Sequence, residues 1–219
     1  GRSQKVYPRF LTTPLSKNSM EDPVNTPEFW DACYDSEMDG WDLGGPTPVF
    51  QRLASEIPKG SICVIGCGRG YDAVTFAKEG FEVTAIDFTD NAILATKKNA
   101  EEANVEINLI KRDIFNLPEN LNFSFDYVME YTCFCAISPL RRFEYDRVVW
   151  QLLKSDGKLL GLFLPLDKEL DEGGPPWGVT QEELYKLFGL HWELVSEEMP
   201  SDSITKRIDR ETLMIWKKK

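Results

Sequence analysis

The group with the clearest chemical potential is a glycine-rich turn, Gly66-Cys67-Gly68-Arg69-Gly70, which directly follows a short apolar run. Glycines at this spacing let the backbone turn sharply and approach a ligand closely. The N-terminus of a helix that follows such a turn favours a negative group, for example a phosphate or a carboxylate. The pattern therefore predicts a ligand site between Gly66 and the start of the next helix.

A carboxylate completes this pattern. Asp87 comes 21 positions after Gly66, at the end of the next predicted strand. An acid in this place can accept hydrogen bonds from both ribose hydroxyls of a bound nucleoside. The structural alternative is a tight strand-to-helix turn with Asp87 capping the helix that follows. Both parts together, at this spacing, favour the nucleoside site.

The glycine spacing also bears on which nucleoside is bound. A dinucleotide fingerprint reads Gly-x-Gly-x-x-Gly, whereas here Gly70 holds the fifth position and Tyr71 the sixth. This favours S-adenosylmethionine over NAD as the cofactor, and an NAD(P)-dependent oxidoreductase stays open as the alternative. Asp113 and Ile114 follow the third predicted strand, where they can accept the adenine amino group and pack on its ring. The structural alternative is that Asp113 is an ordinary turn residue.

Three aromatic residues, Trp30, Tyr34 and Trp41, precede the first predicted strand. Aromatic faces attract a cation such as a sulfonium, and Trp does so most strongly. We expect this segment to fold over the site as a lid. The alternative is that the three rings only fill the core or anchor the N-terminal arm.

These residues need a scaffold, and the chain predicts an α/β one. Strands are expected at 61–65, 81–86, 106–110, 125–130, 158–164, 192–197 and 211–216. Helices are expected from Pro27, over 48–57, 71–79, 90–103 and 139–153, and after the capping box at Thr180. Their alternation predicts a doubly wound, mostly parallel seven-stranded sheet. The last two strands have no helix between them, which predicts an antiparallel hairpin at the sheet edge.

Length and composition narrow the function. The 219 residues predict a single domain over 26–219, preceded by a polar, proline-bearing arm over 1–25 that is draped over it or partly disordered. A net charge of −11 argues against a nucleic-acid partner and against docking on anionic membranes. No signal peptide or membrane-spanning run is recognisable. Five cysteines without metal-ligand spacing and one histidine, His191, predict reduced thiols, a cytoplasmic location and no metal site.

Beyond the glycine turn, the chain resembles the thiopurine, thiol and halide methyltransferases of the class I S-adenosylmethionine-dependent group. The similar segments are Phe29-Trp30, Gly40-Trp41-Asp42-Leu43-Gly44, Pro46-Thr47-Pro48, residues 66–72, Asp113-Ile114-Phe115, residues 131–137 and Gly173-Gly174-Pro175-Pro176-Trp177. The Trp-Asp, Phe-Cys-Ala-Ile and Gly-Gly-Pro-Pro segments are more specific than the turn, and they resemble plant-type halide/thiol enzymes more than mammalian thiopurine enzymes. Residues 1–25 lie outside the resemblance.

The resemblance implies a Rossmann-like class I methyltransferase fold that uses S-adenosylmethionine and releases S-adenosylhomocysteine. The residues that it implies as cofactor contacts are Trp30, Tyr34, Trp41, Gly66, Gly68, Asp87, Asp113, Ile114 and Tyr131. Among these, Tyr34 stands where the plant-type enzymes have a third tryptophan. Tyr131 is expected beside the transferring methyl group, where its hydroxyl orients the nucleophile. The alternative for Tyr131 is a core aromatic at the end of a strand.

The implied reaction is methyl transfer by in-line displacement to a small sulfur or halide nucleophile: a thiol, bisulfide, thiocyanate, a halide or a thiopurine. Such a nucleophile needs no general base, so positioning and desolvation should dominate. A methyltransferase with an oxygen or nitrogen acceptor, and a binding module that lost transfer, stay open. Three further expectations concern other parts of the chain. Arg141-Arg142 either attracts an anion or, as we favour, forms a solvated helix face. Cys133 and Cys135 are expected to be small apolar side chains that fill space in an extended segment. We expect the protein to be a monomer.

Overall fold

The computed structural model describes residues 22–219. The predicted arm over 1–25 therefore lies outside the described residues except for its last four, where Pro23–Asn25 forms a 3-10 helix, η2. Val24 of this turn is buried against the body of the protein. The division of the chain into an arm and a single domain stays a prediction.

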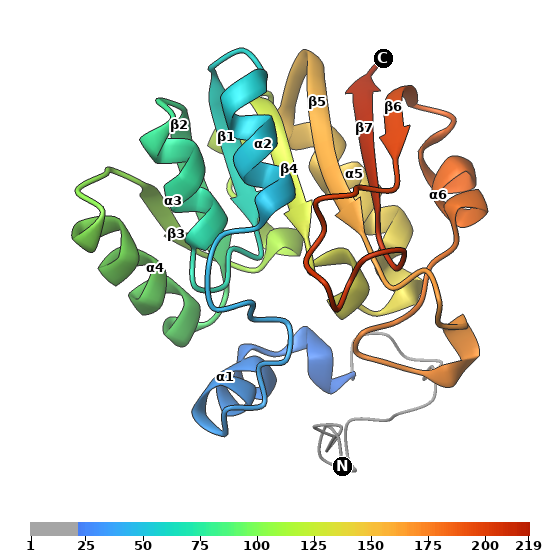
Figure 1. The fold of residues 1–219 in the computed structure, drawn as a ribbon, viewed down its shortest axis with the longest axis horizontal. Helices are drawn as coiled ribbons and strands as arrows, with labels where there is room; N and C mark the ends of the chain where they lie inside the picture. The colour runs from blue at the N-terminus through green and yellow to red at the C-terminus, as the bar shows by residue number, and fades with distance from the viewer. Residues whose placement is uncertain (1–21) are drawn as a thin grey trace.

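Seven strands form one sheet in the order β3-β2-β1-β4-β5-β7-β6 (Figure 1). Strands β1 to β5 pair in parallel, whereas β7 pairs antiparallel with both β5 and β6. This confirms the doubly wound, mostly parallel sheet with an antiparallel edge. The strands are β1 Ser61–Ile65, β2 Glu82–Asp87, β3 Asn108–Lys111, β4 Phe125–Tyr131, β5 Leu153–Phe163, β6 Trp192–Glu198 and β7 Thr212–Lys218.

Helices cover both faces of the sheet. Successive side chains of each buried strand point to opposite faces, so the apolar side chains on both faces must be covered. In β1, Ile62 packs in a cluster with Phe50 of α2 and Phe76 of α3. Its neighbour Cys63 packs in a second cluster with residues of α5 and α6, among them Tyr145. The helices are α1 Pro27–Asp35, α2 Pro48–Glu56, α3 Tyr71–Lys78, α4 Asp90–Glu102, α5 Arg142–Leu152 and α6 Gln181–Phe188.

The region around α5 and β5 differs from the sequence prediction. A 3-10 turn occupies Pro139–Arg141, so the helix expected from Pro139 begins only at Arg142. β5 begins at Leu153, directly after the helix, although the strand was expected from residue 158. Asp156 and Gly157 lie in a bulge inside this strand, where the pairing with β4 shifts register and Asp156 has a φ of 60°.

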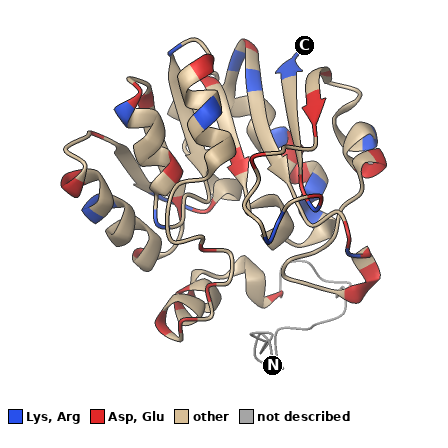
Figure 2. Cartoon of the chain, in the orientation of Figure 1, with Lys and Arg blue, Asp and Glu red and all other residues tan. Residues whose placement is uncertain are grey.

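The order of the strands determines where a ligand can bind. The chain turns away from β1 in both directions, to β2 on one side and to β4 on the other, so a crevice opens at the carboxyl ends of these strands. Helix α1 lies below these ends in Figure 1. Its charged residues are all acidic (Figure 2). No helix among the described residues is long and apolar enough to cross a membrane.

Candidate active site

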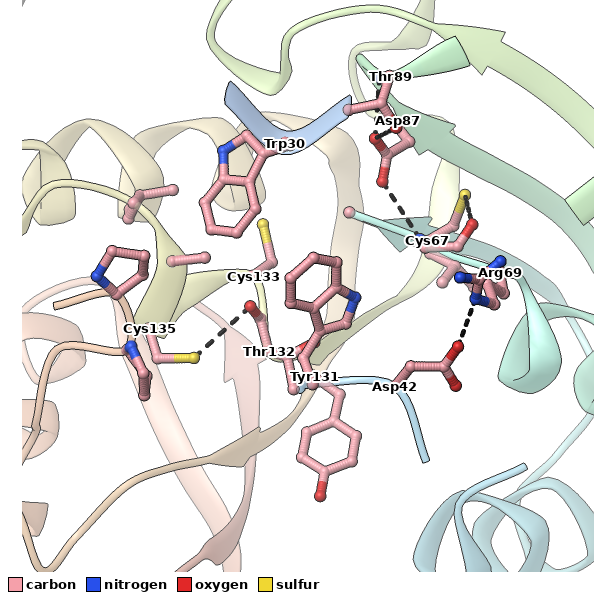
Figure 3. A pocket seen from close by; sticks show the side chains of 18 of the residues that line it. Trp30, Asp42, Cys67, Arg69, Asp87, Thr89, Tyr131, Thr132, Cys133 and Cys135 are labelled. Carbon is pink, nitrogen blue, oxygen red and sulfur yellow. Dashed lines mark hydrogen bonds and ion pairs between the residues drawn. The ribbon is translucent and has the colours of Figure 1, made fainter. Parts of the chain in front are cut away.

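A cavity of about 430 Å³ lies at the carboxyl ends of β1, β2 and β4 (Figure 3). All nine residues that the sequence predicted as site residues contribute to its lining. They are Trp30, Tyr34, Trp41, Gly66, Gly68, Asp87, Asp113, Ile114 and Tyr131. The structure therefore brings together residues that span a hundred positions of the chain.

The glycine turn is shaped by close contacts that leave no room for a side chain. Gly66 has a φ of +57°, and a Cβ on it would lie 3.0 Å from the Cβ and Sγ of Cys133. Gly70 has a φ of +77°, and a Cβ there would lie 2.5 Å from the side chain of Thr96. Thr96 also donates a hydrogen bond of 2.9 Å to the carbonyl of Gly68. These contacts hold the turn so that its backbone faces the cavity.

Asp87, at the end of β2, is fixed by three hydrogen bonds. Its Oδ2 accepts from the Gly68 amide at 3.2 Å, and its Oδ1 accepts from the amide and hydroxyl of Thr89, both at 3.0 Å. The cap of α4 is Thr89, which accepts from the Ala92 amide, so the helix-capping alternative for Asp87 is wrong. Burial raises the pKa of Asp87 against the effect of these donors.

Asp113 and Ile114 lie at the next strand end. Oδ1 of Asp113 accepts a hydrogen bond of 2.9 Å from the Phe115 amide and so begins a 3-10 turn, as a turn Asp does. Ile114 is 8% exposed and belongs to the core beneath this part of the cavity. Both residues line the cavity, so the turn role of Asp113 does not remove it from the site.

The aromatic residues form one cluster over the cavity. The ring centres of Trp30 and Trp41 are 5.5 Å apart with planes at 79°, and those of Tyr34 and Trp41 are 5.2 Å apart at 88°. This edge-to-face packing is the favoured geometry for aromatic pairs. The indole of Trp30 donates to the carbonyl of Val24 at 2.9 Å, which ties α1 to the last part of the arm.

Two sets of polar contacts join residues 39–47, which follow the aromatic cluster in the chain, to the glycine turn and the start of α3. Arg69 forms ion pairs with Asp39, at 2.6 Å, and with Asp42. Asp72, in the first turn of α3, accepts hydrogen bonds of 2.8 Å from both the amide and the hydroxyl of Thr47. Burial raises the pKa of Asp72 to about 6. Local patterns did not predict these pairings, because the partners lie 25 to 30 positions apart.

Tyr131, at the end of β4, donates its hydroxyl proton to Oε2 of Glu211 at 2.6 Å. Both residues are buried, and burial raises the pKa of Tyr131. Figure 3 shows the Tyr131 ring extending away from Trp30 and Cys133. Sequence reasoning missed Glu211 because the pair is separated by 80 positions.

The loop after β4 is organised by Glu130, another residue that the sequence did not single out. Its carboxylate accepts hydrogen bonds from the amides of Cys133 and Phe134, at 3.1 and 3.0 Å, and from the Tyr145 hydroxyl at 2.6 Å. Burial raises the pKa of Glu130 to about 7. The loop holds Cys133 against Gly66, in the centre of the view in Figure 3.

Cys133 and Cys135 lie in this loop. The extended conformation expected for them is wrong, because Phe134–Ala136 forms a 3-10 turn. Both side chains line the cavity. Burial raises the pKa of both thiols, that of Cys135 to about 12, so they remain protonated and uncharged near neutral pH. This agrees with their interpretation as small apolar fillers.

The solvated helix face expected for Arg141-Arg142 is also wrong, since the two residues are 9% and 8% exposed. Arg141 stacks over the ring of Phe115 at 3.6 Å and pairs with Glu144 at 2.9 Å. Arg142 donates to the carbonyl of Gly178 at 3.0 Å. A guanidinium can lie flat on an aromatic ring, which lets such a residue be buried. Of the two, only Arg141 lines the cavity.

Comparison with known proteins places this geometry in a family. The sequence model described as "Thiopurine S-methyltransferase (TPMT)" matches residues 25–217. Thiocyanate methyltransferase 1 of Arabidopsis thaliana is 34% identical over 197 residues, which cover 86% of this chain and 84% of the relative. A thiopurine S-methyltransferase of Vibrio cholerae is 28% identical over 183 residues, covering 75% of this chain and 82% of the relative.

The fold has solved counterparts. The 1,6-didemethyltoxoflavin-N1-methyltransferase of Burkholderia thailandensis, solved with that compound and S-adenosylhomocysteine bound, superposes with a TM-score of 0.76. The alignment covers 94% of this chain and 92% of that one at 19% identity, so it shows the fold alone. The sheet is therefore Rossmann-like, and the similarity to methyltransferase relatives, rather than the fold, removes support from the oxidoreductase alternative. With the family model matching nearly the whole described chain, this protein belongs to the thiopurine S-methyltransferase family.

Proposed function

We propose that the cavity binds S-adenosylmethionine and that the chain transfers its methyl group to a small sulfur or halide nucleophile. The observation that carries the proposal is Asp87, a partly buried carboxylate hydrogen-bonded to the glycine turn, which lines the same cavity as the aromatic cluster. Relatives named for thiocyanate, thiols and thiopurines support a sulfur acceptor.

The residues present fit this cofactor. Asp87 is held by three donors, and a carboxylate has about four acceptor positions, so it can still accept from a ribose hydroxyl. The bare backbone at Gly66 and Gly68 allows a close approach that a Cβ would prevent. Asp113 and Ile114 are assigned to the adenine, by hydrogen bonding and by packing.

The aromatic cluster is assigned to the methionine end. The rings of Trp30, Tyr34 and Trp41 enclose this end of the cavity, and the face of an aromatic ring attracts a positive sulfur. S-adenosylmethionine supplies there an electrophilic methyl group on a sulfonium, which a nucleophile attacks from the opposite side. The protein's part is to hold the two reactants in line and to exclude water from charges that cancel as the reaction proceeds.

Tyr131 remains the proposed contact to the acceptor. Because the Tyr131 hydroxyl donates its hydrogen bond to Glu211, its oxygen can only accept a hydrogen bond from an acceptor molecule. Such an oxygen can receive a hydrogen bond from a thiol while that thiol is still protonated. This arrangement is compatible with a thiol among the candidate acceptors.

Transfer from methyl-labelled S-adenosylmethionine tests the proposal. The acceptor panel contains iodide, bisulfide, thiocyanate, a small thiol and a thiopurine, together with oxygen and nitrogen analogues of the thiol, and volatile and non-volatile products are counted separately. We expect label on sulfur acceptors and none on the oxygen or nitrogen analogues. Transfer only to oxygen or nitrogen would overturn the acceptor assignment, and no transfer to any acceptor would favour a binding module.

A further inference from the structure

Arg207 has a buried charge that the contacts described so far do not use. It lies in the segment between β6 and β7, is 6% exposed and lines the cavity. Its Nη2 donates to the carbonyl of Trp41 at 3.2 Å, and its guanidinium carbon is 5.0 Å from the ring centre of Tyr131. Its Nη1 is fully buried and has no hydrogen-bond partner among residues 22–219.

No carboxylate within the described part of the chain forms an ion pair with Arg207. The nearby acid Glu211 accepts the Tyr131 hydroxyl instead. Two other cations of the cavity lining are paired: Arg210 with Asp167 at 2.8 Å, and Arg141 with Glu144 at 2.9 Å. Glu211 acts on Arg207 electrostatically but accepts none of its hydrogen bonds. The buried Nη1 therefore keeps an unfilled donor position, which is unfavourable unless a ligand fills it.

Charge is distributed unevenly around the cavity. Its acidic lining residues, Asp42, Asp72, Asp87 and Asp113, all precede β4 in the chain, in the part of the lining assigned to the cofactor, which also contains Arg69 and Arg112. Beyond Asp113 the lining contains no carboxylate but includes the cations Arg141, Lys206, Arg207 and Arg210. This is notable in a protein of net charge −11, where acidic residues are spread over most elements (Figure 2). The part of the lining that follows Asp113 in the chain therefore carries positive charge, which favours a negative group on a ligand that contacts it.

We propose that Arg207 binds a carboxylate on the acceptor, so that the preferred acceptors are small thiols that carry a carboxylate. The inference rests on the proposed function and names the substrate class of the same site. A guanidinium presents a planar set of donors that matches a carboxylate, and a charged hydrogen bond of this kind is stronger than a neutral one. The unpartnered Nη1 supplies such a donor next to Tyr131.

The step is balanced without any further reactant. The thiol loses its proton to solvent, and the thiolate sulfur forms a bond to the methyl carbon. The bond between that carbon and the sulfonium breaks, and its electron pair stays on the departing sulfur, which becomes a neutral thioether. The carboxylate is unchanged and only positions the acceptor opposite the leaving sulfur.

The first measurement compares two acceptors on the unaltered protein: 3-mercaptopropionate and its methyl ester, which has the same thiol and no charge. The comparison is made at equal thiolate concentration, because the two thiols ionise differently. We expect kcat/KM for the carboxylate to exceed that for the ester by at least about tenfold. A ratio at or below one overturns the inference and leaves the proposed function standing.

The second measurement repeats this ratio in Arg207→Gln and Arg207→Lys, with Arg147→Gln on the exposed side of α5 as the matched loss of a positive charge. The ratio is internal to each preparation, so it is insensitive to a partial loss of folding or of cofactor binding. We expect it to fall close to one in R207Q, to be partly retained in R207K and to stay unchanged in R147Q. An unchanged ratio in R207Q overturns the role of Arg207. Failure of both thiols and of every sulfur and halide acceptor in the panel to accept a methyl group refutes the proposed function and this inference with it.

Discussion

The carboxylate of Asp87 accepts a hydrogen bond of 3.2 Å from the backbone amide of Gly68. This contact joins the end of β2 to the turn after β1, so the acid and the glycines form one structural unit. The sequence had indicated only that the two features have the spacing of a nucleoside site. The structure adds that the acid helps to hold the turn, which gives Asp87 a structural as well as a binding role.

Replacement of Asp87 by alanine tests its binding role. Asp87→Ala should weaken the binding of S-adenosylmethionine and S-adenosylhomocysteine by roughly 1–3 kcal/mol, because ribose hydroxyls and the Gly68 amide lose an acceptor. Isothermal titration measures the loss, with Glu182→Ala on the exposed face of α6 as the control. Unchanged affinity in a folded D87A protein would remove Asp87 from the site.

Gly70 is predicted to tolerate no side chain. In Gly70→Ala the new Cβ meets Thr96 at 2.5 Å in a left-handed conformation, whereas Gly80 has a similar conformation, with a φ of +90°, and open space around it. Chemical denaturation should show a loss of about 1 kcal/mol for G80A, from backbone strain alone, and of at least about 2 kcal/mol for G70A. Equal losses would show that Thr96 moves aside without cost.

The raised pKa of Asp72 predicts a pH dependence of stability. The folded state binds the proton more tightly than the unfolded chain, so this contribution is present at low pH and is lost as pH rises from about 4 through the folded value of about 6. In Asp72→Asn the amide keeps both contacts to Thr47 and does not titrate. From pH 4 to pH 7 the unfolding free energy of the unaltered protein should fall by about 1–2 kcal/mol relative to D72N. Parallel pH profiles of the two proteins would contradict the assignment.

Trp41 is predicted to recognise the charge of the cofactor. Trp41→Leu should weaken binding of S-adenosylmethionine more than of S-adenosylhomocysteine, since only the former has a sulfonium, and the difference should be about 0.5–2 kcal/mol. Competition titration of both ligands against the same protein measures it. Phe123→Leu, at an exposed ring that packs on Trp150, is the control. Equal losses for the two ligands would assign Trp41 a packing role only.

Local sequence patterns predicted those site residues that lie in or directly after the element whose pattern identifies them. The glycine turn, Asp87 and Asp113 follow buried strands, and the carboxyl ends of parallel strands meet at one edge of a sheet. The capping box at Thr180 and Glu183 is present as expected. The sequence resemblance located the aromatic residues, whose packing no local rule predicts.

Long-range partners could not be predicted in this way. Glu211 lies 80 positions from Tyr131, and Arg207 lies 166 positions from the Trp41 carbonyl that it contacts. The burial of Arg141 and Arg142 depends on Phe115 and Phe134, which other segments supply. Only the folded arrangement reveals these pairs. The monomeric state and the cytoplasmic location stay predictions.

A crystal structure of the protein with S-adenosylhomocysteine is the most direct test of the central claim, that this cavity is the cofactor site. We predict the ribose hydroxyls at hydrogen-bond distance from Asp87, the adenine against Asp113 and Ile114, and the sulfur facing Trp30 and Trp41. Crystals grown without S-adenosylhomocysteine and soaked with NADH should show no dinucleotide. A nucleoside bound elsewhere on the sheet, or NADH seated on the glycine turn, would contradict the account.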